Sequence, residues 1–138
     1  MVDAVRVTRL LRSLDEGLAS LSRRQGAAAD DRCDETWLLA VKYLFVTTIE
    51  ACVDIAQHLC STESLGTPSD NADAIRRIGN AGVIHETTAA AVALAVGFRN
   101  VLVHEYVDVD DRIVIERLND HEDLHEYSRQ VAQWLSRQ

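Results

Sequence analysis

The chain has 138 residues, enough for one domain with a substantial core and too few for two comfortable ones. Its composition is globular, with 47% hydrophobic residues, one proline and six glycines, and it lacks the dense turn signals of all-β folds. No apolar run approaches the roughly 18 residues of a membrane span, and charges occur throughout the amino terminus. We expect a single domain over residues 1–138, located in the cytoplasm, with no membrane association.

The charge balance constrains the partners. The chain carries 14 basic and 22 acidic residues, a net charge of −8, and an acidic surface repels nucleic acid at long range. An activity on RNA therefore requires a local basic site or a partner, and DNA binding is not expected. The three cysteines, Cys33, Cys52 and Cys60, form no C-x-x-C pair, so we expect reduced core thiols and neither a metal nor a cofactor.

The first half of the chain reads as two long helices. Apolar residues recur at three- and four-residue spacing from Asp3 to about Arg24, and a broad apolar face extends from about Asp34 to Cys60. The second helix would be about 40 Å long at 1.5 Å per residue, which makes it the spine of the domain. Residues 61–69, which contain the only proline, read as a loop.

The second half reads as shorter helices. A cap at Ser69 or Asp70 begins a short helix that Gly79 or Gly82 can end, and an Ala-rich helix starts at about Glu86. Residues 107–118 alternate partly like a strand, although a short helix is favoured. Asn119 and Glu122 fit a capping box that would begin the closing helix. The fold expected is an all-α, up-and-down antiparallel bundle of about four to six helices.

The segment RNVLVHEY carries the most suggestive side chains. On a helix Asn100 and His104 share a face, Arg99 and Tyr106 nearly eclipse, and all four could line one wide polar stripe. A guanidinium presents forked donors to phosphate oxygens, and an imidazole transfers protons near neutral pH. The segment therefore indicates phosphate binding or phosphodiester cleavage, although on spacing alone a cluster of surface ion pairs is the commoner arrangement.

This octet, preceded by Phe98, resembles the R-x4-H-x-Y signature of the HepT toxins, a branch of the HEPN family, and matches it at every signature position. The surroundings are similar too: a long second helix carries Glu50 and Asp54, and a glycine-containing break, IGNAGVI, precedes the Ala-rich helix. The resemblance implies a HEPN-type helical bundle that forms a two-fold homodimer. It also implies a metal-independent endoribonuclease whose composite cleft holds both copies of the signature.

The resemblance also assigns roles to individual residues. Arg99 would bind and polarise the scissile phosphate, His104 would transfer protons to and from the 2′-hydroxyl, and Asn100 would orient the site. Tyr106 matches the tyrosine that an MntA-type nucleotidyltransferase antitoxin modifies with AMP in some members. The chain would then be the toxin of a toxin–antitoxin pair. Two alternatives stay open: a non-catalytic module that dimerises and regulates a nucleotidyltransferase, and a nucleotide-binding sensor that uses the same arginine.

The segment His121–His125 spells H-E-x-x-H, the zinc-protease pattern. The charged Asp123 and Glu126 occupy positions that a zincin helix packs with apolar residues, and no third ligand is evident. We therefore interpret this segment as a solvated helix start.

Glu50, Asp54 and His58 lie four residues apart on the long helix, a spacing that could bind a metal. A carboxylate on a packed face needs a cationic partner, so facing the dimer cleft or pairing with Arg99 is the favoured interpretation. Three basic residues are candidates for positive potential near a cleft, with a solvated face as their commoner role: Lys42, Arg76 and Arg77.

Overall fold

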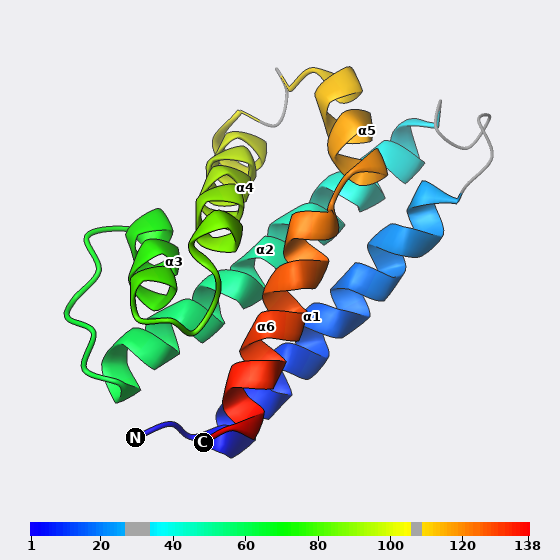
Figure 1. Ribbon diagram of the computed structural model, residues 1–138. Helices are drawn as coiled ribbons and strands as arrows, with labels where there is room; N and C mark the ends of the chain where they lie inside the picture. Colours follow the sequence, from blue (N-terminus) through cyan, green and yellow to red (C-terminus); the bar gives the residue numbers. More distant parts are fainter. Residues whose placement is uncertain (27–33, 106–108) are drawn as a thin grey trace.

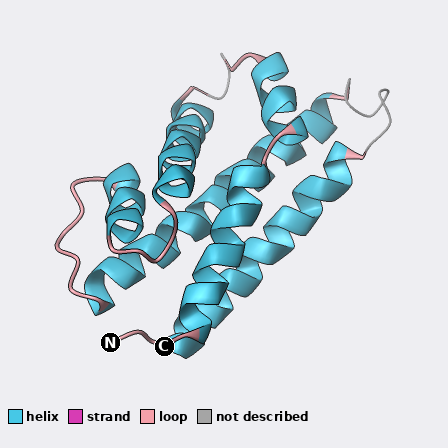
Figure 2. Cartoon of the chain, viewed as in Figure 1, coloured by secondary structure: helices cyan, strands magenta, loops and turns pink. Residues whose placement is uncertain are grey.

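A computed structural model describes residues 1–26, 34–105 and 109–138, and these residues form six helices and no strand (Figures 1 and 2). This confirms the expected all-α bundle. The helices are α1 (Ala4–Gln25), α2 (Glu35–Thr62), α3 (Asn71–Asn80), α4 (Glu86–His104), α5 (Asp111–Asn119) and α6 (Glu122–Ser136).

Aspartates begin four of the six helices. The side chain of each accepts a hydrogen bond from a backbone N–H in the first turn, which satisfies one of the amides left free there. These residues are Asp3, Asp34, Asp70 and Asp110. The caps explain why the predicted helix starts of the first half agree with the structure to within one residue.

The described part of the ambiguous stretch forms α5 from Asp111 onward, as favoured, but the capping box predicted after it is wrong. Asn119 is the last residue of α5, and His121, with no capping side-chain bond, precedes α6. Glu122 therefore opens α6 without a reciprocal cap. Gly82, at φ +81°, adopts the left-handed conformation just after α3, whereas Gly79 lies inside that helix.

The helices pack around one core (Figure 1). α1 and α2 form an antiparallel pair, α6 packs against α1 and α4, and the short α3 packs against both α2 and α4. A Cβ atom at Gly79 would collide with the Cβ of Ala89, so glycine permits the close approach of α3 and α4. α2 contacts every other helix, which confirms its role as the spine.

The core includes buried apolar residues from all six helices. Tyr127 of α6 is fully buried, and its hydroxyl donates a hydrogen bond of 2.7 Å to the backbone carbonyl of Cys52. Cys52 and Cys60 are buried free thiols, as predicted, and burial raises the pKa of both, so they remain protonated. Cys33 lies outside the described residues.

Among the described residues, α4 alone is long and apolar enough to span a membrane by length and composition. The core helix of a soluble protein can be equally long and apolar. α4 packs here against α2, α3 and α6, and its buried face contributes Val92 and Val96 to the core. Length and composition therefore give weak support for a membrane span.

His121 makes folding sensitive to mild acid. It is 3% exposed, its Nδ1 lies 2.8 Å from the carbonyl oxygen of Leu118, and burial lowers its pKa below 6.5. The unfolded chain therefore binds a proton at a higher pH than the folded chain does. Stability is full above about pH 6.5 and falls as the pH drops toward the lowered pKa, by up to about 1.4 kcal/mol per pH unit.

We expect the urea midpoint to decrease between pH 7.5 and pH 5.5 by more in the wild type than in a His121→Gln variant. Comparing the two proteins cancels the contribution of carboxylates common to both. The same pH dependence in the two proteins would show that His121 is not the titrating group.

Candidate functional site

Arg99 is held by an ion pair between two helices. It lies in the last two turns of α4, its side chain is 19% exposed, and its Nη2 donates to Oε1 of Glu50 on α2 at 2.6 Å. This confirms the interpretation that Glu50 pairs with Arg99. The pair fixes the guanidinium against the middle of α2 instead of leaving it free in solvent.

Asn100 supports the same guanidinium. Its side-chain oxygen accepts a hydrogen bond of 3.1 Å from Nη1 of Arg99. The Nε of Arg99 is buried and has no hydrogen-bond partner among the described residues. A guanidinium offers five N–H donors, so after these two bonds, and with Nε buried, two Nη hydrogens remain for a further acceptor. Glu50 and Asn100 thus orient the guanidinium of Arg99.

Asp54 follows Glu50 by one turn of α2 and is exposed. Partial desolvation of the carboxylate raises its pKa most, the charge of Glu50 raises it further, and Arg6 of α1 opposes both. The next polar residue on this line, His58, is half-buried, and its Nε2 has no hydrogen-bond partner among the described residues. With Glu50 committed to Arg99, this line does not gather a metal site.

His104 lies on a different face from Arg99. It is the last residue of α4, it is exposed, and it forms no hydrogen bond to another described residue. Five residues turn an α-helix by about 140°, which places Arg99 toward α2 and His104 toward solvent. Arg99 and His104 therefore lie at opposite edges of the predicted polar stripe within one protomer, and Tyr106 lies outside the described residues.

The outer face of α4 is apolar and leads to His104. Leu94 is 79% exposed and Val101 43% exposed, and Ala90 and Gly97 share this face. A Cβ atom at Gly97 would meet nothing within 4 Å. The stripe formed by Ala90, Leu94, Gly97 and Val101 therefore has no partner within the protomer, which is unusual for so apolar a helix face.

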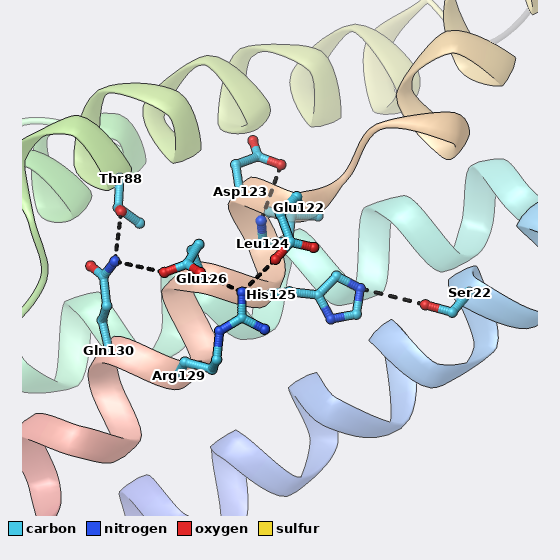
Figure 3. Close-up of polar contacts among 9 residues, drawn as sticks. All are labelled: Ser22, Thr88, Glu122, Asp123, Leu124, His125, Glu126, Arg129 and Gln130. Atoms are coloured by element: carbon cyan, nitrogen blue, oxygen red, sulfur yellow. Dashed lines mark hydrogen bonds and ion pairs between the residues drawn. The ribbon is translucent and has the colours of Figure 1, made fainter.

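Figure 3 shows how the glutamate of the H-E-x-x-H segment is used. Arg129 forms ion pairs with both Glu122 and Glu126. Gln130 then donates to Oε2 of Glu126 at 3.1 Å and to the hydroxyl of Thr88 at 2.9 Å, which links α6 to α4. These contacts give the acidic side chains a structural role on α6.

The two histidines of that segment differ from the solvated start that the sequence predicted. His125 is half-buried, with Nε2 lying 3.4 Å from the hydroxyl of Ser22 on α1. His121 belongs to the core and contacts Phe45 edge to face, with ring centroids 6.5 Å apart. Within the described part of the chain, no three His, Cys, Asp or Glu side chains are grouped to hold a metal ion.

Two of the three candidate basic residues serve the fold. Lys42 pairs with Asp111 at 2.9 Å and ties α2 to the start of α5. Arg77 pairs with Asp73 at 2.8 Å and donates to the carbonyl oxygen of Leu65. Neither contact involves Arg99, so the expectation that they supply positive potential at the site gains no support.

The chain is similar to named nucleases. It is 30% identical over 79 residues to the mRNA nuclease HepT of Shewanella oneidensis, a match covering 56% of this chain and 59% of that protein. It is 28% identical over 111 residues to the tRNA nuclease HepT of Aphanizomenon flos-aquae, covering 79% and 75%. The chain thus spans less than two thirds of the first of these relatives.

A solved structure shares the fold. The tri-AMPylated Shewanella oneidensis HEPN toxin in complex with MNT antitoxin superposes with a TM-score of 0.85 at 22% identity, covering 96% of this chain and 99% of that one. The similarity supports the fold alone. The model of the family described as Ribonuclease HepT-like matches residues 11–131, a range that includes the whole signature from Arg99 to Tyr106. The chain belongs to the HepT-like ribonuclease family.

Proposed function

We propose that the protein is a metal-independent endoribonuclease, the toxin of a toxin–antitoxin pair, and that two copies form its active site. Arg99 binds the scissile phosphate, while Glu50 and Asn100 orient its guanidinium. His104 acts as the acid–base group on the 2′-hydroxyl. Asp54, one turn from Glu50, adjusts the charge beside the ion pair.

The observation that carries this proposal is the geometry of the signature. Arg99 is fixed against α2, and His104 stands on another face at the end of α4. One protomer therefore presents the phosphate-binding group and the proton-transfer group in different directions. A cleft that combines the signatures of two protomers resolves this separation, because each can supply a group that the other lacks there.

The apolar stripe on α4 supports the same assembly. A two-fold axis beside Gly97 would pack one stripe against its copy, and small residues at Ala90 and Gly97 permit close approach. Pairing would bury Leu94 and Val101, whose exposure costs free energy in water. The stripe ends at His104, so this residue lies at the border of the proposed contact.

The relatives support the substrate and partner. Two are named mRNA and tRNA nucleases, so the proposed substrate is RNA and not DNA. A similar structure is an AMP-modified toxin bound to its antitoxin. We extend this to a nucleotidyltransferase partner that modifies Tyr106 with AMP, which would place negative charge and bulk close to His104 in the sequence. An RNA substrate and a nucleotidyltransferase partner together imply a cytoplasmic location.

The second candidate function is a non-catalytic module that dimerises through the same stripe and regulates a nucleotidyltransferase. The net charge of −8 and the apolar stripe favour it, whereas the oriented Arg99 and the free His104 favour the enzyme. Cleavage of RNA by the purified chain, with loss of cleavage in Arg99→Ala, decides between the two.

A further inference from the structure

The charge of this acidic protein is distributed unevenly. α1 carries five arginines and only two acidic residues, so its net charge is +3 in a chain of net charge −8. The rest of the chain therefore carries −11. The helix is about 33 Å long at 1.5 Å per residue, so the positive charge extends along one edge of the molecule. These arginines are Arg6, Arg9, Arg12, Arg23 and Arg24.

Two of these arginines carry charges that their surroundings do not neutralise. Arg9 and Arg12 are exposed and form no ion pair with any carboxylate in the described part of the chain. One of the two acidic residues, Asp15, accepts a hydrogen bond from Ser128 of α6 and so belongs to the helix interface. The open surface beside Arg12 carries Arg9 on one side and the acidic Asp15 and Glu16 on the other.

The composition of this face distinguishes between two classes of polyanion. A stable protein–protein interface has an apolar core depleted in charge, whereas nucleic-acid interfaces are polar and strongly positive. On α1 the single large apolar side chain that is exposed is Val5, at the amino-terminal end. The face fits an RNA backbone better than an acidic protein.

The basic face connects to the proposed cleavage site. Arg6 lies close enough to Asp54 for its charge to stabilise that carboxylate, and Asp54 is one turn from Glu50, which holds Arg99. The two acidic residues between α1 and Arg99, Asp54 and Glu50, thus each lie close to an arginine. α1 itself does not contact α4, because α2 and α6 lie between them.

Resting on the proposed nuclease function, we propose that the outer face of α1, centred on Arg9 and Arg12, binds the phosphate backbone of the RNA substrate outside the cleavage site. It supplies the local basic surface that an acidic nuclease requires. Its contribution is to affinity for long RNA and not to the chemical step.

The test measures RNA affinity separately from cleavage. A 20-nucleotide single-stranded RNA is titrated by fluorescence anisotropy at several salt concentrations, with every protein carrying His104→Ala to prevent cleavage. Each phosphate contact on single-stranded RNA contributes about 0.7 to the slope of log affinity against log salt. We expect Arg9→Gln and Arg12→Gln each to reduce the slope by about 0.7, and the double variant by about 1.4. Arg129→Gln, an exposed charge on α6 already paired with glutamates, controls for the lost charge.

Cleavage kinetics, measured with proteins that retain His104, provide the second readout. The Arg9→Gln/Arg12→Gln protein should show a raised KM for the 20-mer, an unchanged kcat, and unchanged cleavage of a dinucleotide. If the double variant has the same slope of log affinity against log salt as Arg129→Gln, the proposal is overturned, whatever the cleavage rates are. So would lost binding of polyglutamate with RNA binding intact, which would indicate an acidic protein partner.

The two proposals fail in different ways. If the wild-type protein cleaves neither substrate, the proposed nuclease function is wrong. The dependence of RNA affinity on salt then decides separately whether α1 binds RNA. Cleavage of both substrates with an unchanged slope removes the α1 site alone.

Discussion

Replacing His104 with alanine is expected to lower kcat for RNA cleavage by about 10²- to 10⁴-fold, the usual contribution of a positioned acid–base group. His104 is exposed and forms no hydrogen bond to another described residue, so its loss should change stability by no more than about 0.5 kcal/mol. The measurement is the single-turnover cleavage rate of a labelled RNA, with thermal unfolding recorded for each protein.

The matched control is His85→Ala. His85 is also an exposed histidine, and its side chain makes no capping bond at the start of α4. This variant should cleave at the wild-type rate. Comparable losses in both variants, or none in His104→Ala, would contradict the assigned role of His104.

Val101→Glu is expected to dissociate the proposed dimer and to abolish cleavage in the same protein. The substitution places a charge on the apolar stripe of α4, where a two-fold axis would set two glutamates against each other without a partner. Because Val101 is 43% exposed in the protomer, the fold itself should tolerate the change. Light scattering should report about the 15.3 kDa mass of one chain in place of twice that mass.

Ile113→Glu provides the comparison for Val101→Glu. Ile113 is 49% exposed on α5, which packs against α1 and α2 and not against α4. It should stay dimeric and active. A wild-type protein that is already monomeric at micromolar concentration, and still cleaves RNA, would rule out the composite site.

The sequence predicts most of this fold because its helix signals are local. The aspartate caps and the three- and four-residue apolar spacing are read within one helix. The capping box predicted at Asn119 does not form because Asn119 is the last residue of α5. Where one short helix follows another directly, two nearby positions carry similar helix-start patterns, and the sequence does not distinguish them. The core position of His121 depends on α2 and could not be inferred from spacing.

The site was predictable in part for the same reason. The pairing of Glu50 with Arg99 follows from the need of a carboxylate on a packed helix for a cation, although only tertiary structure identifies the arginine. The separation of Arg99 from His104 follows from five residues at 100° each, which the assumption of one wide stripe overlooked. The fates of Lys42 and Arg77, both used in ion pairs, depend on contacts between elements.

We propose that the signature cleaves RNA without a metal ion. The direct measurement is cleavage of RNA in excess EDTA by the purified, unmodified wild type beside Arg99→Ala, with matched thermal stability. In Arg99→Ala the carboxylate of Glu50 loses its partner, but its side chain is 44% exposed and can be hydrated, so the variant should fold. We expect cleavage by the wild type that EDTA does not reduce, and none by the variant. A well-folded, unmodified wild type that leaves RNA intact would contradict the account.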